Sequence, residues 1–423
     1  MIYFVLFLVL LLLVVSYLLS KTLLNPIVMF LCLWSVILLF SSLGLYNMNK
    51  VSEKTYILIL LGIIAFVIGG VISFSLLSVN GSIQKNIQLN LNYNHSIARI
   101  CLGISFIGML YLFLTSLQLL LQGYNLNQIH NMFYGYGEHS MLLSDTVHAI
   151  INWICLPLLY VSLFYASINI FNRKYSYFFI LTFFTLFLYL IGNASRVMLG
   201  IVAINFLILM KFYNINLSKK FKKKIRQAII LFVLFFIFLT LSRINTQNSN
   251  NVNSLYAYFT IPVNLFDYWI NWFDSVGAEH TNGGAFVFGF LSWINFFMEK
   301  IGINFLNYNT ISEYIMATQN RWINVFPGKS YNAFVTMFYY FYMDLGSLGI
   351  VIGSSLFGFI SYYTYFYSVK IRNANNLLYY LFIVQCILTS FVRWQIGSVS
   401  FVVELIAIMM ISAKIRFRVG RKN

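Results

Sequence analysis

Long apolar runs recur along the chain, and the short segments between them carry the charge and most of the turn-forming residues. A helix needs roughly 20 apolar residues to cross about 30 Å of hydrocarbon, and several runs reach that length. A weaker apolar run near 284–298 is open to three interpretations: a further span, a re-entrant segment or an interfacial helix. We expect eleven membrane-spanning helices, near residues 1–20, 25–45, 56–79, 97–121, 148–168, 177–193, 197–213, 227–243, 344–368, 377–392 and 397–413.

The composition agrees with this pattern. Hydrophobic residues make up 60% of the 423 residues and charged residues 9%, with a mean hydropathy of +0.81, which excludes a soluble globular domain. The fold class predicted is an all-α polytopic membrane protein with about 11–12 transmembrane helices. The first run lacks the basic start and small-residue cleavage pattern of a signal peptide, so we expect a retained helix. The four cysteines each stand alone in an apolar run, as core residues do.

The net charge of +17 follows from the topology of a membrane protein. Basic residues gather on the cytoplasmic side of such proteins, and the segment 211–226 holds seven of them with no acid. This segment and the basic tail, residues 414–422, are therefore predicted to be cytoplasmic, which with eleven spans puts the N-terminus outside. The Lys and Arg residues lie at helix ends and form no basic soluble module, so we expect no nucleic-acid partner.

The chain divides into three regions by this topology. Residues 1–243 form an N-terminal bundle of transmembrane helices, residues 244–343 a large external loop region, and residues 344–423 the C-terminal transmembrane helices with the basic tail. The external region holds five of the ten acidic residues and four of the seven tryptophans, and it is too long for a simple connection. Interleaved aromatic and polar residues suit interfacial helices, or a segment folded back over a cavity.

Several basic residues lie on the predicted external face, where the positive-inside rule does not account for them. Arg196 follows a turn at Gly192 and Asn193 and precedes the next helix, whose N-terminus adds free N–H donors. Guanidinium groups of this kind suit a pyrophosphate, although arginines at helix ends also anchor in lipid headgroups. The predicted anion-binding residues are Arg196, Arg243, Arg321, Arg393 and Lys329.

The stretch DYWINWFDSVGAEHTNGG, residues 267–284, has the densest supply of groups able to deprotonate a hydroxyl. We expect the general base among Asp274, Glu279 and His280, although these carboxylates could instead bind sugar hydroxyls or pair with the arginines. Rings on the same face can pack on sugars, and a carboxylate at the start of a span can cap its helix or face the site. The predicted sugar-binding residues are Trp269, Trp272, Trp322 and Asp344.

An earlier external segment also carries side chains that metals bind. Its members are His130, Glu138, His139, Asp145 and His148. Their spacing matches no known ligand pattern, so a polar loop is the favoured interpretation and we expect no metal and no cofactor.

Two motifs carry a resemblance to a known family. The short turn GNASR ends in Arg196, and the block PGKSYNAFVTMFYYFYMDLGSLG, residues 327–349, follows the large external region. In this layout the chain resembles the Wzy-type polymerases that join oligosaccharide repeat units of bacterial O-antigen and capsule. The resemblance covers most of the chain in layout, but only these motifs in residues.

The resemblance implies an activity and a location. Such polymerases move a growing glycan from undecaprenyl pyrophosphate to a sugar of the next lipid-linked repeat unit, on the periplasmic side of the bacterial inner membrane. External arginines hold the pyrophosphate without a metal, Arg196 being the matching position here. The implied partners are the lipid-linked oligosaccharide, membrane lipid and a protein that regulates chain length. A related glycan ligase and a lipid-linked oligosaccharide flippase remain the alternatives, and a transporter should carry more charge inside its spans.

Overall fold

The computed structural model is almost entirely helical and confirms an all-α membrane protein. It describes residues 1–80, 93–134, 142–171, 177–193, 197–213, 254–302, 308–370 and 376–413, with single positions between 219 and 234. Within this part, five helices are long and apolar enough to cross a membrane. Five shorter apolar helices accompany them: α2, α8, α9, α15 and α16.

The chain forms two compact units. The first contains residues 1–88, 250–373 and 382–402, and the second contains residues 89–249, 374–381 and 403–423. The first unit holds α1 (Ile2–Ser20), α2 (Pro26–Ser42), η1 (Leu45–Asn47), α3 (Glu53–Asn80), α11 (Ser254–Ser275), α12 (Phe288–Lys300), α13 (Tyr308–Asn320), β1 (Ile323–Phe326), β2 (Lys329–Tyr331), α14 (Thr336–Tyr365) and η4 (Phe366–Lys370). The predicted division into three regions follows membrane topology and stays a prediction.

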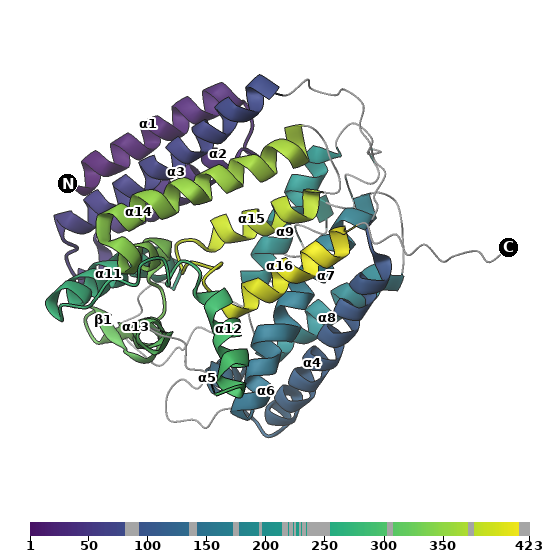
Figure 1. Cartoon of the computed structure of the whole chain (residues 1–423). Coiled ribbons are helices and arrows are strands. Elements are labelled where there is room, and N and C mark those ends of the chain that lie inside the picture. Colours follow the sequence, from purple (N-terminus) through teal and green to yellow (C-terminus); the bar gives the residue numbers. More distant parts are fainter. Residues whose placement is uncertain are drawn as a thin grey trace. The chain divides into compact units, whose positions relative to one another are not determined.

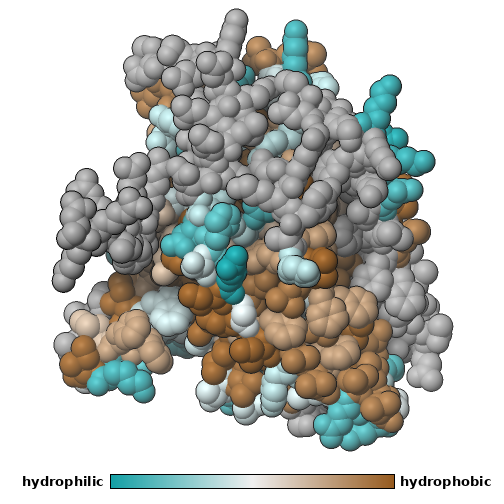
Figure 2. Space-filling view, turned by 90° about the vertical axis from the view of Figure 1, so that its right-hand side faces the viewer, coloured by the Kyte–Doolittle hydropathy of each residue, from teal (hydrophilic) through white to brown (hydrophobic). Residues whose placement is uncertain are grey.

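The second unit is built around α4 (His95–Leu121), which packs against α7 (Leu156–Phe171) and α8 (Tyr177–Asn193). Its other helices are α5 (Leu126–Tyr134), α6 (Asp145–Ile150), η2 (Ile151–Cys155) and α9 (Val197–Phe212). Two further helices, α15 (Leu377–Thr389) and α16 (Val399–Ser412), each contain residues of both units. Apolar side chains cover much of the described surface on the face seen in Figure 2, as lipid contact requires.

In the first unit, α3 and α14 run side by side along most of their length (Figure 1). Lipid tails are as apolar as the side chains, so close backbone contact rather than hydrophobicity holds such helices together. A Cβ added at Gly69 would overlap the carbonyl oxygen of Ser355, and one at Gly358 would overlap that of Phe66. Glycine at these two positions is therefore what allows the helices to approach.

The helix α14 is broken near its start. Leu345 and Gly346 have non-helical backbone angles, and Gly346 has a φ of 60° that favours glycine. Before the break, Lys54 contacts Tyr342 and Gly62 lies against the ring of Phe338, so this half runs opposite to α3. After it, Ser355 and Gly358 meet α3 in the parallel sense. The half-helix therefore runs from beside Gly62 toward the start of α3, the chain reverses at the break there, and the long helix runs back along α3.

The half-helix Thr336–Asp344 is buried along its whole length. The ring of Phe338 lies 4.9 Å from that of Trp34 on α2 and 6.2 Å from that of Phe266 on α11. The predicted span 344–368 thus begins where the long part of α14 begins, and the preceding half-helix was not predicted.

Ten of the eleven predicted spans coincide with helices of the structure, and the span near 227–243 lies outside the described residues except for single positions. The weak run near 284–298 becomes α12, which at 13 residues is about 20 Å long and too short to cross a membrane alone. In the predicted external region the described residues form three helices and a two-stranded hairpin, β1 paired antiparallel with β2.

Candidate functional site

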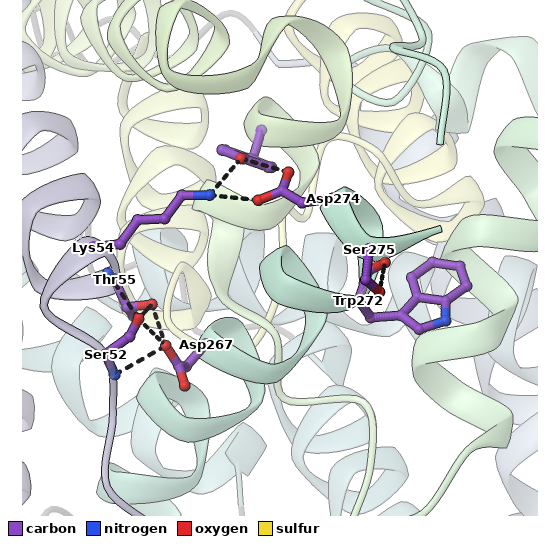
Figure 3. Close-up of polar contacts among 8 residues, drawn as sticks. Ser52, Lys54, Thr55, Asp267, Trp272, Asp274 and Ser275 are labelled. Atoms are coloured by element: carbon purple, nitrogen blue, oxygen red, sulfur yellow. Dashed lines mark hydrogen bonds and ion pairs between the residues drawn. The ribbon is translucent and has the colours of Figure 1, made fainter. Parts of the chain in front are cut away.

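The candidate site lies in the first unit, where the start of α3 meets the region between α11 and α14. The carboxylate of Asp274 pairs with Lys54 and accepts a hydrogen bond of 2.8 Å from the hydroxyl of Tyr342 (Figure 3). Lys54 Nζ also donates to the Tyr342 hydroxyl at 3.1 Å. Both oxygens of Asp274 are thus engaged, which makes this residue the weakest of the three predicted bases.

A second carboxylate fixes the start of α3 to α11. Oδ1 of Asp267 accepts from the Ser52 N–H at 3.1 Å, from the Ser52 hydroxyl and from the Thr55 hydroxyl at 2.6 Å (Figure 3). The neighbouring Asn49 donates to the carbonyl of Asn324 in β1 at 2.7 Å. The loop before α3 and the start of α3 therefore contact both α11 and β1.

A third carboxylate organises the turn that carries His280. Asp344 is 4% exposed and accepts from the Thr281 hydroxyl and from the N–H groups of Ala285 and Phe286 at 2.8 and 2.9 Å. The prediction that Asp344 binds sugar is wrong for this structure, because its oxygens are occupied and buried. It instead ties the turn 281–286 to the break in α14.

His280 lies exposed at the end of this turn. Its Nδ1 is 3.2 Å from the carbonyl oxygen of Met343 and donates this hydrogen bond, so in the neutral ring Nε2 is the acceptor. The ring stacks on Phe273 with 5.6 Å between centroids. Of the three predicted bases, His280 and the exposed Glu279 are the two that form no ion pair with a described residue.

The tryptophans of this region differ in what they offer a ligand. Trp322 is 51% exposed, while the guanidinium of Arg321 lies 5.3 Å from the ring centroid of Trp272. Trp269 is fully buried against Trp272 and Tyr339. The prediction that Trp269 stacks on a sugar is therefore wrong, because no face of its ring is accessible.

Arg393 occupies a linker between two short helices, residues 390–398. Its backbone pairs with Thr336, and the backbone bonds of Val335 and Met337 to Val392 and Ser390 continue this contact. The indole of Trp394 donates to the carbonyl of Phe286 at 2.8 Å, which joins the linker to the turn that Asp344 holds. Nε of Arg393 is buried and makes no hydrogen bond with any described residue.

The remaining predicted cations fall into two groups. Lys329 is half-buried in β2, and neither it nor Arg321 forms an ion pair with a described residue. Burial raises the pKa of the adjacent Tyr331, which keeps this phenol neutral. Arg196 and Arg243 lie outside the described residues, so their roles stay predictions.

Two of the residues considered for a metal, His130 and His148, make hydrogen bonds to other protein groups. His130 Nδ1 bonds the carbonyl of Asn193 at 2.9 Å, and His148 Nε2 lies 2.9 Å from the amide of Asn152. Glu138 and His139 lie outside the described residues. Through His130, the helix α5 is fixed to Asn193, the last residue of α8.

Sequence reasoning missed Lys54, Tyr342 and Ser52, which complete the carboxylate contacts. More than 200 residues separate Lys54 from Asp274, and only the fold joins them. No known family model, no curated protein and no solved structure matches this chain.

Proposed function

We propose that the protein is a polymerase of lipid-linked oligosaccharide repeat units of the O-antigen or capsule type. It transfers a growing glycan from undecaprenyl pyrophosphate to a sugar hydroxyl of the next lipid-linked unit. The observation that carries this proposal is Arg393, whose Nε is buried without a hydrogen-bond partner among the described residues. A buried unbonded donor is costly, and the oxygens of a pyrophosphate are the acceptors a guanidinium binds best.

The position of Arg393 suits a substrate with a lipid tail. The helices α15 and α16 have 13 and 14 residues, about 20 Å each, so neither crosses about 30 Å of hydrocarbon and their linker falls inside it. The backbone of Thr336 pairs with that of Arg393, and nearby Phe338 contacts Gly62 of α3. Gly62 and Lys54 are about 12 Å apart along the axis of α3, so Arg393 lies well below the charged start of this helix. Irregular backbone at such depth occurs where it is buried in protein or lines a cavity.

The chemistry follows from the charges. The acceptor hydroxyl attacks the anomeric carbon of the donor sugar, the bond from this carbon to the pyrophosphate oxygen breaks, and the pyrophosphate leaves with the electron pair. Arg393 stabilises that charge as it develops, and Arg321 assists it. Arg196 and Arg243, which lie outside the described residues, are proposed to assist as well. Nε2 of His280 takes the proton of the acceptor hydroxyl, since its Nδ1 is already bonded to Met343.

The same proposal includes the setting. The enzyme lies in the bacterial inner membrane with its C-terminus in the cytoplasm, works on the periplasmic side, and cooperates with a protein that regulates chain length. The support is the distribution of basic residues in the sequence together with the contact of the loop before α3 with the segment 254–335.

The test is incubation of the purified protein with a lipid-pyrophosphate-linked repeat unit from its own host, followed by gel separation of the glycans. We expect a ladder of regularly spaced products, lost in Arg393→Ala and Arg196→Ala and weakened in Arg393→Lys. Lys300→Ala removes an exposed cation of the same unit on α12 and should leave the ladder intact. Unchanged substrate with folded wild-type protein would refute the proposal, and a ligase would likewise give no ladder from this single substrate.

A lipid-linked oligosaccharide flippase is the second candidate. Helices interrupted within the membrane are typical of transporters, and both α14 and the α15–α16 pair are interrupted. Proteoliposomes loaded with a fluorescent lipid-linked repeat unit separate the two: translocation without elongation would favour the flippase.

A further inference from the structure

A cavity of about 480 Å³ lies in the first unit between α11, β1 and the loop before α3, and polar side chains contribute much of its lining. From α11 it is lined by Asn264, Asp267, Tyr268 and Asn271, and from the facing wall by Asn49 and Asn324. The α11 residues are spaced three or four apart, so they form one stripe along a single helix face. Its volume falls in the range of about 300–1,000 Å³ that small-molecule sites occupy.

The lining has the chemistry of a site for hydroxyl groups. Four asparagine amides each offer a donor and an acceptor, as a sugar hydroxyl does in return. The Asn271 amide makes no hydrogen bond with a described residue, and no described donor reaches Oδ2 of Asp267, since the bonds from Ser52 and Thr55 all go to Oδ1. These groups remain available to a ligand.

The charges of the cavity argue against an ion. Asp267 and Lys50 are the charged residues of the lining, and their charges cancel. Asp267 is also held in place by the start of α3, so its free oxygen has a fixed direction. Tyr268, 38% exposed, and Trp272 add aromatic surface on which the apolar face of a pyranose can pack.

We infer that this cavity binds an uncharged pyranose unit of the glycan, held by Asn271 and the free oxygen of Asp267 and packed on Tyr268. This inference rests on the proposed function, because that function identifies the sugar as part of the transferred glycan. The cavity lies at the start of α3, where Asp267 bonds Ser52 and Thr55, and would hold a part of the glycan distant from the pyrophosphate at Arg393.

The experiment is saturation-transfer NMR on the full-length protein in detergent, with the methyl glycosides of glucose, galactose and their N-acetylated 2-amino forms as probes. We expect transfer to at least one glycoside, reduced about fivefold or more in Asn271→Ala and in Tyr268→Leu, as loss of one hydrogen bond or one packing surface predicts. Asn320→Ala changes an exposed asparagine at the end of α13, outside the cavity, and should bind as the wild type does. Thermal transitions of all variants establish that they are folded.

Absence of transfer to every glycoside, or equal transfer in all variants, would overturn the assignment. The ladder assay separates this failure from that of the proposed function. A protein that makes a ladder but fails the NMR test would support the polymerase function and exclude sugar binding in the cavity. Glycoside binding without a ladder would support the sugar site and exclude the polymerase function.

Discussion

His280 combines a fixed tautomer with an accessible second nitrogen, which distinguishes it from the carboxylates around it. Its Nδ1 bonds the carbonyl of Met343, while Asp274 is paired with Lys54 and Asp344 is buried under three donors. Only a group with a free acceptor can take a proton from an incoming hydroxyl. At the scale of single residues, these contacts favour the prediction of His280 as the base over that of Asp274.

Substitution of His280 by Asn tests this order. The Asn amide can still donate to Met343 but cannot act as a base, so we expect the polymerisation rate to fall about 10²–10⁴-fold with the protein still folded. Asp274→Asn, measured in the same gel assay, should fall by less than tenfold. The reverse order of the two variants would exclude His280 as the base.

Asp344 should be needed for the fold of the turn 281–286. Ala285 donates to Oδ1 and Phe286 to Oδ2, so in Asp344→Asn the NH2 group that replaces one of these oxygens faces one of the two N–H groups. Each hydrogen bond to a charged group contributes about 1.5–3 kcal/mol, so we expect a clear drop in apparent melting temperature. Glu313→Gln, an exposed position on α13, is the control, and an equal melting temperature for both variants would contradict the structural role.

At the scale of elements, apolar length predicted the long apolar helices and missed the buried half-helix of α14 and the helix α11. The half-helix Thr336–Asp344 is too short to give a length signal and is buried among Trp34, Gly62 and Phe266. The helix α11 mixes aromatic and polar residues and contains Pro262, so its pattern looked like an interfacial loop. Its stripe of Asn264, Asp267 and Asn271 was a helical signal that the sequence carried.

The packing of α3 on α14 gives a prediction about elements. In Gly358→Ala the added methyl group meets the backbone of Phe66, which cannot move without separating the two helices. We expect a loss of about 1–3 kcal/mol, measured as a lower midpoint of unfolding in detergent. Gly103→Ala on α4 is the matched control, because its Cβ meets no atom within 4 Å, and it should keep or slightly raise the midpoint.

At the scale of the whole molecule, the sequence predicted the membrane class and the positions of most of the apolar helices, but not which distant segments meet. The charge pattern could not pair Lys54 with Asp274 or Asn49 with Asn324, since those contacts depend on how the helices pack. It also did not show that Arg393 lies on a linker between half-length helices, because its apolar flanks look like ordinary spans. One cysteine prediction was wrong: Cys101, Cys155 and Cys386 are buried, but Cys32 is exposed.

Orientation in the membrane can be tested with single cysteines introduced after the four native ones are replaced. The basic loop and tail predict that Asn423→Cys is cytoplasmic and Asn320→Cys external. A membrane-impermeant maleimide should therefore label position 320 in intact cells and position 423 only after the membrane is permeabilised. Lys50→Cys provides an internal check, because Asn49 bonds Asn324 and position 50 must share the side of position 320. Labelling of 50 and 320 from opposite sides would contradict the contacts of the first unit, whereas labelling of both from the cytoplasm would leave those contacts intact and refute an outward-facing active site.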